Sequence, residues 1–441
     1  MKQVKAFKNG VHPFEGKEYA MDSVIKTIMP SALMVYPMQN GAGMPSKPCV
    51  NVGDRVLKGQ EIAEAGGFVS ARIHSAVSGK VKAIERKITV NGEIIESIVI
   101  ENDKLDETVE GFGKQHRLDE FSESDIKDII RHAGIVGLGG ACFPTSVKLN
   151  PKNADKIDRI IINGAECEPY LTSDYRIMLE RGRNVIRGIK AILKVFPNAK
   201  AIIGIEDNKP EAIKVMSELA LSEYNIDVMP LKTKYPQGGE RQLVFAVTGR
   251  KLYSKLLPSD KGCVVFNIAT CYAIYEAVYC SIPLIHRVMT VTGDGVNNPC
   301  NVDVPIGISH KEVLDACGGA KDNVVKFISG GPMMGSAMYS LDTPVQKNSA
   351  SILAFTTDDV AEVPTSSCIH CGRCVKACPV NLVAQMLAKS VKVNDYEKFA
   401  ELGGMECIEC GCCTYVCPAR IPITQLCKFG KSKVRKMSVK K

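Results

Sequence analysis

The sequence has little that would anchor it in a membrane or export it. Its most apolar stretch is 264–285. Asn267, Glu276 and Pro283 interrupt this stretch, so it predicts a buried strand and helix rather than a bilayer crossing. Residues 1–10 are polar and lysine-rich with no apolar run behind them, which predicts no export signal. We therefore expect a soluble or peripheral protein.

Acidic residues are missing from the segment 428–441, which holds seven Lys or Arg residues. One interpretation is a disordered, solubilising end. The other is a peripheral contact with anionic lipid or with an acidic partner. A nucleic-acid partner is not expected, because no binding motif accompanies these charges.

A disulfide framework is also missing, although the chain holds 18 cysteines. Eight of them lie in two repeated motifs and the others are scattered. Scattered thiols together with a clustered set indicate a reducing, intracellular setting.

The repeated motif lies near the end of the chain. It reads Cys368-x-x-Cys371-x-x-Cys374-x-x-x-Cys378-Pro379 and recurs as Cys407-x-x-Cys410-x-x-Cys413-x-x-x-Cys417-Pro418. This spacing is typical of bacterial ferredoxins with two [4Fe-4S] clusters, in which the fourth cysteine of each repeat ligates the other cluster. We therefore expect a first cluster site of Cys368, Cys371, Cys374 and Cys417, and a second cluster site of Cys407, Cys410, Cys413 and Cys378. Paired zinc sites or disulfides are the weaker alternatives, because a zinc site usually takes four ligands in two pairs.

The length of 441 residues predicts about three domains. Residues 1–100 contain short strand patterns, with strand–turn–strand units at 52–60 and 73–81. These units resemble the barrel-sandwich hybrid of lipoyl and biotinyl carrier domains. The segment 71–78 contains no lysine to modify, so we expect the carrier shape without its chemistry. His74 is expected to be a packed side chain rather than a ligand.

The middle of the chain alternates helix and strand patterns. A helical pattern at 122–133 leads into a glycine-rich segment at 134–145, and an apolar strand at 159–162 ends in Asn163. Further strands are predicted at 201–205, 226–229 and 263–267, with helices at 210–221, 240–247 and 270–279. This alternation predicts a largely parallel sheet with helices on its faces. Taken alone, the glycines predict only a tight turn, because a helix rather than a strand precedes them.

Two segments carry a family resemblance. Gly137-x-Gly139-Gly140-Ala141-x-Phe143-Pro144-Thr145-x-x-Lys148 and Asn163-x-x-Glu166-x-Glu168-Pro169 resemble the flavin- and NADH-binding subunit of respiratory complex I. Tyr235-x-x-Gly238-x-Glu240 and Asn267 fall where that family has further flavin contacts. The region 283–338, with Thr292-Gly293-Asp294-Gly295, resembles the β-grasp domain of the same family. The complete order of units is similar to the RnfC family, which belongs to the ion-pumping ferredoxin:NAD oxidoreductases.

The resemblance implies a multi-domain α/β and α+β fold. Its parts are a barrel-sandwich hybrid-like domain at 1–115, a Rossmann-like FMN- and NADH-binding domain at 116–281 and a β-grasp (SLBB-like) domain at 282–350. An α-helical ferredoxin-like domain with two clusters follows at 351–427, and a basic tail at 428–441. The helical type of ferredoxin domain is expected because two helical patterns, at 382–387 and 396–402, separate the cysteine motifs.

The resemblance also implies cofactor-binding residues. Gly137, Gly139 and Gly140 would let the backbone approach FMN, and Lys148 would neutralise its phosphate as a point charge. The remaining flavin-site residues implied are Asn163, Glu166, Gly238 and Asn267.

NADH would meet three further residues. Phe143 would stack on it, and Glu168 with Glu240 would hold its polar groups, so Phe143 and Glu168 are expected to be closest to the chemistry. Without the resemblance, Phe143 would be interpreted as core and the acids as a solvated face. Leu138, Ala165 and Cys142 depart from the family pattern, replacing an arginine, an acid and a glycine.

The function implied is that of a peripheral electron-transfer subunit. NAD(H) exchanges two electrons, each cluster exchanges one, and FMN can do both. The expected partners are the other subunits of a membrane-bound complex, including a ferredoxin-like iron–sulfur subunit, at the cytoplasmic face of a bacterial membrane. A soluble flavin and iron–sulfur cobalamin reductase of a bacterial microcompartment is the first alternative. A scaffold that has lost its flavin and only relays electrons is the second.

Overall fold

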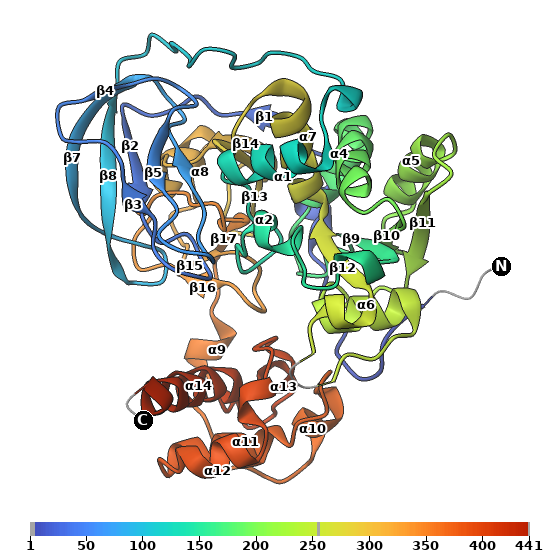
Figure 1. Ribbon diagram of the computed structural model, residues 1–441. Helices are drawn as coiled ribbons and strands as arrows, with labels where there is room; N and C mark the ends of the chain where they lie inside the picture. Colours follow the sequence, from blue (N-terminus) through green and yellow to red (C-terminus); the bar gives the residue numbers. More distant parts are fainter. Residues whose placement is uncertain (1–4, 254–255, 440–441) are drawn as a thin grey trace.

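The computed structural model describes residues 5–253 and 256–439. The described residues form four sheets and a separate helical unit (Figure 1). The first unit is built from short antiparallel strands in two sheets, ordered β2-β8-β7-β4 and β3-β5-β6. Its strands are β2 (Leu33–Pro37), β3 (Lys47–Pro48), β4 (Arg55–Val56), β5 (Glu61–Glu64), β6 (Ile73–His74), β7 (Gly79–Ile88) and β8 (Ile94–Asn102). His74 is buried, and burial lowers its pKa to about 3, so its ring is a neutral, packed group.

The second unit is a parallel sheet with the order β11-β10-β9-β12. Its strands are β9 (Arg159–Gly164), β10 (Lys200–Glu206), β11 (Ile226–Leu231) and β12 (Cys263–Asn267). The helices around it are α1 (Glu123–His132), α2 (Thr145–Lys148), α3 (Ser173–Glu180), α4 (Gly182–Val195), α5 (Pro210–Ala220), α6 (Glu240–Thr248) and α7 (Ile268–Cys280). The strand order reverses between β9 and β12, and such a switch point is where open α/β sheets bind ligands.

Close packing of α4 on α7 holds this sheet and its helices together. A side chain at Gly188 of α4 would come within 1.8 Å of the carbonyl oxygen of Cys271 in α7, so only glycine permits this approach. The predicted helices and strands of this region are present, with ends shifted by one or two residues.

The third unit is a six-stranded sheet with the order β1-β14-β13-β17-β15-β16. Its elements are β1 (Ile25–Thr27), β13 (His286–Thr292), β14 (Cys300–Pro305), α8 (His310–Ala316), β15 (Lys326–Ser329), β16 (Ser336–Ala337) and β17 (Ser351–Phe355). Strand β17 pairs with both β13 and β15. This unit therefore extends past residue 350, where the sequence pattern ended it, because the apolar run of β17 completes its buried layer.

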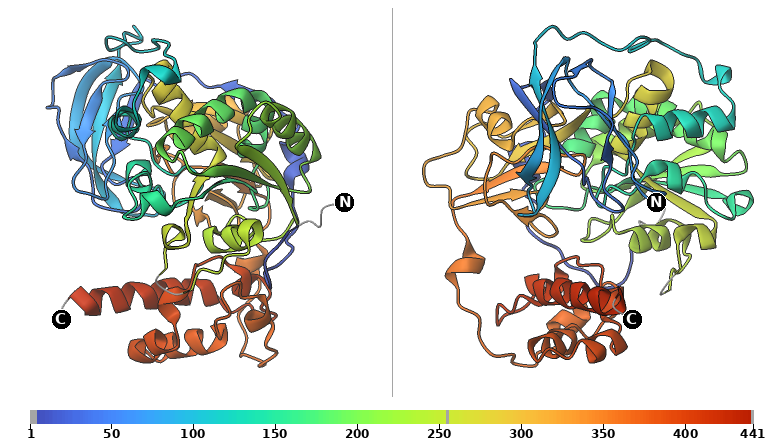
Figure 2. Two further views of the ribbon diagram at one scale, coloured as in Figure 1. Left: turned by 45° about the vertical axis from the view of Figure 1, so that its right-hand side comes forward. Right: turned by 60° about the vertical axis from the view of Figure 1, so that its left-hand side comes forward.

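The cysteine motifs lie in a helical unit set apart from the sheets (Figure 2). Its helices are α9 (Asp359–Glu362), α10 (Arg373–Ala377), α11 (Ala384–Lys392), α12 (Tyr396–Glu401), α13 (Cys412–Tyr415) and α14 (Ile423–Val439). Helices α11 and α12 separate the two motifs, as predicted. The basic segment does not start as a disordered tail, because residues 428–439 continue α14; residues 440–441 lie outside the described part. Over residues 5–253 and 256–439, no helix is both long enough and apolar enough to cross a bilayer.

The first residues of the chain leave the unit to which the sequence pattern assigned them. Residues 5–19, here called the N-terminal arm, run along the parallel sheet, where Lys5 bridges Leu231 and Val11 bridges Tyr235. The backbone amide of Gly10 then donates to the carbonyl of Ala377 at 3.0 Å. The arm therefore joins the parallel sheet to the cluster unit.

Candidate flavin and iron–sulfur site

Two asparagines mark the ligand-binding edge of the parallel sheet. Asn163 and Asn267 stand opposite each other in register at the ends of β9 and β12, where the strand order reverses. The Asn163 amide donates to the carbonyl of Gly238 at 3.0 Å. The Asn267 side chain caps α7 by accepting from Ala269 and donates to Asp174 at 2.6 Å. Both predicted flavin-site asparagines therefore lie at one site.

The glycine-rich segment folds against this edge. A side chain at Gly139 would come within 3.0 Å of the Asn267 side chain, so glycine is needed for the approach. Gly140 faces open space, and Gly139 to Ala141 are exposed. Gly137 has only ordinary contacts around it, although its amide donates to the carbonyl of Phe143 at 2.9 Å. The loop therefore offers bare backbone at Gly139 and Gly140.

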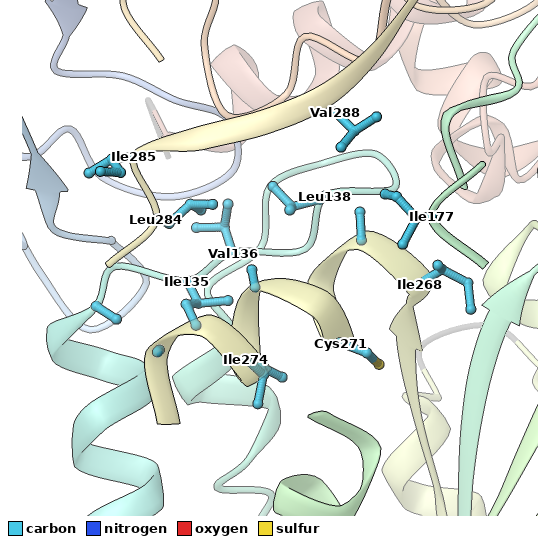
Figure 3. Close-up of a cluster of buried hydrophobic side chains, with 14 of the residues drawn as sticks. Ile135, Val136, Leu138, Ile177, Ile268, Cys271, Ile274, Leu284, Ile285 and Val288 are labelled. Carbon is cyan, nitrogen blue, oxygen red and sulfur yellow. The ribbon is translucent and has the colours of Figure 1, made fainter. Parts of the chain in front are cut away.

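The departures from the family pattern in this loop point into the protein. Leu138 is 5% exposed and lies among Val136, Ile177 and Val288, as Figure 3 shows. Cys142 is buried with a left-handed φ of 51°, the conformation that favours glycine. Burial raises the pKa of the Cys142 thiol to about 11. These two side chains therefore leave the exposed face of the loop open.

Lys148 and Glu240 lie together at the same edge. The Lys148 ammonium contacts the Glu240 carboxylate at 3.2 Å and the carbonyl of Val265, on β12, at 3.0 Å. Glu240 is the first residue of α6. Both side chains are partly exposed, so a ligand phosphate and a ligand hydroxyl can compete for them. The structure thus brings together Lys148, predicted to bind the FMN phosphate, and Glu240, predicted to bind polar groups of NADH.

The loop after β9 is held in place by buried groups. The Glu166 carboxylate accepts from the amides of Asp174 and Tyr175 at the start of α3, so it serves as a cap for that helix. Beneath the loop, the Lys17 ammonium donates to the carbonyls of Glu166, Glu168 and Leu171 at 2.9, 3.1 and 2.6 Å. Burial lowers the pKa of Lys17 to about 8. Glu166 therefore stabilises the start of α3, and its predicted contact with flavin stays a prediction.

Glu168 lies where the parallel sheet meets the six-stranded sheet unit and the helical unit. Its carboxyl accepts from the amide of Met333, in the β15–β16 loop, at 3.2 Å, and one of its oxygens lies 3.3 Å from the hydroxyl oxygen of Tyr235. The same hydroxyl donates to the carbonyl of Cys410 at 2.7 Å. Burial raises the pKa of Glu168 to about 7. One hydroxyl therefore connects the predicted NADH carboxylate to a ligand loop of the second cluster site.

Sequence reasoning missed Asp174, Lys17 and Met333. Asp174 is half-buried, the loss of solvent around it and the nearby Glu166 raise its pKa to about 7, and it orients the amide of Asn267. No local motif marks these residues, because they reach the site from α3, the N-terminal arm and the β15–β16 loop. Phe143 is half-buried beside the glycine loop, and its predicted contact with NADH stays a prediction.

Some of the cysteines predicted to share a cluster lie near one another, and the two complete ligand sets stay predictions. Cys378 lies close enough to Cys407 and Cys410 to interact electrostatically with them, and so does Cys413. Cys374 interacts in the same way with Cys417. Among residues 5–253 and 256–439, no group of His, Cys, Asp or Glu converges on a single metal-ion position. A [4Fe-4S] cluster takes one cysteine on each iron, and the two motifs supply eight cysteines, four for each of the two predicted clusters.

The two surplus cysteines of this unit are buried behind the second cluster site. Cys412 hydrogen bonds with Cys410, and Cys427 with Cys407. Both surplus thiols are almost fully covered, so they pack in the interior of this unit.

One cavity lies away from this site. It has a volume of about 680 Å³ and contains none of the predicted site residues. It is lined by Gln115, His116, Arg117, Leu118, Asp119, Arg187, Lys190, Lys194 and Tyr279. A smaller cavity of about 100 Å³ borders Lys17 and Thr172 beside the loop after β9.

Comparison with known protein families gives four matches in chain order. The RnfC barrel sandwich hybrid domain matches residues 5–105, and the Nuo51 FMN-binding domain matches 130–276. The SLBB domain matches residues 288–337 and the 4Fe-4S dicluster domain matches 367–421. These matches confirm the predicted fold classes and their order.

A solved structure shares the fold at low sequence similarity. It is an NAD+-reducing [NiFe]-hydrogenase in the air-oxidised state, with 18% identity and a TM-score of 0.51. The match covers 65% of this chain and 55% of that one.

Curated relatives are much more similar. The C subunit of the proton-translocating ferredoxin:NAD(+) oxidoreductase complex from Clostridium ljungdahlii is 46% identical over 87% of this chain and 84% of the relative. Its Na(+)-translocating counterpart from Acetobacterium woodii is 40% identical over 89% of this chain and 88% of the relative. The C subunit of an ion-translocating oxidoreductase complex from Rhodobacter capsulatus is 38% identical over 99% of this chain and 84% of the relative. This chain therefore belongs to the RnfC family, the C subunits of ion-translocating ferredoxin:NAD(+) oxidoreductase complexes.

Proposed function

We propose that this chain is the NAD(H)-facing electron-transfer subunit of a membrane-bound ferredoxin:NAD+ oxidoreductase complex that moves ions. It exchanges electrons with NAD(H) at the edge of the parallel sheet and passes them through the helical unit. The family membership and the FMN-binding and 4Fe-4S matches support this function. The other subunits of the complex, including an iron–sulfur subunit, are its partners, and we place it peripherally at the cytoplasmic face of the membrane.

The residues at the sheet edge fit a bound FMN. Gly139 and Gly140 offer exposed backbone, the Asn163 and Asn267 amides lie at the strand ends, and Lys148 supplies the positive charge that a phosphate needs. When bound, FMN accepts a hydride and releases electrons singly. Asp174 holds the Asn267 amide in one orientation, so that amide is preorganised.

Carboxylates and thiols complete the proposed site. Glu168 and Glu240 accept hydrogen bonds from NADH hydroxyls, and Phe143 covers its ring. The eight cysteines of the first and second cluster sites hold two [4Fe-4S] clusters, which their grouping in space fits. The observation that carries the proposal is the contact of one hydroxyl, that of Tyr235, with both Glu168 and the peptide of Cys410.

Replacement of Lys148 by alanine tests whether FMN binds at this site. We expect Lys148→Ala to weaken FMN binding at least about tenfold in dissociation constant, since a charge-assisted contact to phosphate is lost. The matched control is Lys152→Ala, which removes an exposed lysine further along the chain. Flavin retention by the purified protein is measured by fluorescence after release. Equal retention in both variants would refute the assignment of Lys148.

A further inference from the structure

The helical unit turns one of its cluster sites toward the flavin-binding sheet. Five polar contacts that join the two units end on or beside a ligand loop of the second cluster site. They are Asn9–Cys378 carbonyl (3.0 Å), Gly10 amide–Ala377 carbonyl (3.0 Å), Gln242–Pro379 carbonyl (3.3 Å), Tyr235 hydroxyl–Cys410 carbonyl (2.7 Å) and Arg241–Glu406 (2.9 Å). A side chain at Gly411 would also strike Met333.

The first cluster site has two of its four cysteines at the surface, while Cys374 is buried and Cys417 half-buried. Cys368 and Cys371 are both exposed, and Ile369 between them is 67% exposed. The whole run 361–371 is exposed. Exposed ligands beside an exposed apolar side chain are unusual for a site with no partner, because such a surface admits water to the cluster.

The surface round these ligands is basic. Residues 363–394 include Arg373, Lys376 and two further lysines but no Asp or Glu. Arg373 and Lys376 are exposed. Arg420 is exposed too, and it follows Ala419, whose carbonyl accepts from the amide of Ser366 at 3.0 Å. Within the described part of the helical unit, the ion pairs found are Lys398–Glu401 and Lys431–Glu409, so these three cations keep their charge available.

We infer that the first-cluster rim, made of Cys368, Ile369, Cys371, Arg373 and Arg420, is the docking face for an electron-transfer protein with an acidic surface. This inference rests on the proposed function and adds direction to it: the second cluster site faces the flavin and the first faces the partner. The exchange is of one electron, so one protein is reduced as the other is oxidised, and no bond forms or breaks. Opposite charges orient such encounters and speed them.

A binding experiment with the iron-loaded full chain tests the docking face. The probe is a purified acidic bacterial ferredoxin, and its affinity is measured by biolayer interferometry at several salt concentrations. We expect the affinity to fall as salt rises, and Arg373→Glu with Arg420→Glu to weaken binding at least about tenfold at low salt, because repulsion replaces attraction. Carbodiimide cross-links to the probe should map to Lys376.

Two control variants locate the effect. Arg183→Glu changes an exposed cation on α4, and Lys433→Glu changes one on the basic helix α14; both should bind the probe as the unaltered chain does. Equal affinity of the rim variant and the controls, cross-links on α14 alone, or no salt-sensitive binding would overturn the inference. Bleaching of the flavin by NADH, recorded on the same rim variant, reports separately on the proposed function and should be unchanged.

Discussion

At the scale of single residues, burial decides the chemistry of the site more than spacing does. Glu168 is half-buried, and its carboxyl contacts the Met333 amide and the Tyr235 hydroxyl rather than a cation. Its pKa is therefore raised from 4.5 to about 7. A carboxyl with this pKa changes charge near physiological pH, which makes its role measurable.

Replacement of Glu168 by glutamine tests that role. We expect the affinity of the protein for NADH to rise as pH increases through about 7, because the ionised carboxylate accepts hydrogen bonds from the ligand, and we expect Glu168→Gln to lose this dependence. The native state holds this proton more tightly than the unfolded chain, so the contribution of Glu168 to the free energy of unfolding falls as pH rises from 4.5 to about 7.

The measurement is NADH titration from about pH 6 to about pH 8, spanning the raised pKa. Glu110→Gln, at an exposed position, is the control and should keep the slope of the unaltered protein. The same slope in Glu168→Gln would show that another group titrates.

At the scale of elements, the site is made where four segments meet. The loop after β9, the N-terminal arm, the β15–β16 loop and the second cysteine motif come together round Glu168 and Tyr235. The cluster unit also relies on α14, whose Lys431 donates to the Cys407 carbonyl at 2.7 Å and to Glu409 at 2.6 Å. These contacts tie the positions of remote segments to one another.

Removal of the Tyr235 hydroxyl tests the junction between sheet and cluster unit. We expect Tyr235→Phe to leave the NADH-driven bleaching of the flavin unchanged and to slow the following reduction of the clusters several-fold, because the Cys410 peptide loses its donor. Stopped-flow spectroscopy separates the two phases. Tyr224→Phe, at an exposed tyrosine, is the control. Slowing of the flavin phase alone would contradict the account.

Removal of the Lys431 charge tests whether α14 influences the reduction potential of the second cluster. A buried cation beside the second cluster site favours the reduced, more negative cluster. Lys431→Met should therefore lower the reduction potential of that cluster, whereas Lys433→Met, at an exposed position, should not. Redox titration followed by electron paramagnetic resonance resolves the clusters. An unchanged potential, or a lowered one for the first cluster only, would refute this role.

At the scale of the whole molecule, local patterns predicted the units but not their contacts. Cysteine spacing predicted the cluster domain, strand–helix alternation predicted the parallel sheet, and the family resemblance implied all four fold classes, which the family matches confirm. The N-terminal arm and β1 were assigned to the first unit, because nothing in their short sequences shows that they pair with β14 or contact Ala377. Likewise, β17 was predicted to belong to the cluster unit, but it pairs with β13 and β15 of the six-stranded sheet. Such pairings depend on residues hundreds of positions apart, which no local pattern records.

The proposed nucleotide, flavin and cluster sites follow one another in a single line through the chain. The sheet edge lies against the second cluster site, and the first cluster site lies at the surface beyond it. If this path carries electrons, nucleotide, flavin and clusters must all be present in one chain.

An anaerobic NADH titration of the iron-reconstituted protein, with its iron counted, tests this claim most directly. The account predicts about eight irons per chain, four for each cluster, and a flavin absorbance that NADH bleaches. Far fewer irons, a chain that never retains flavin, or a spectrum that NADH leaves unchanged would contradict it.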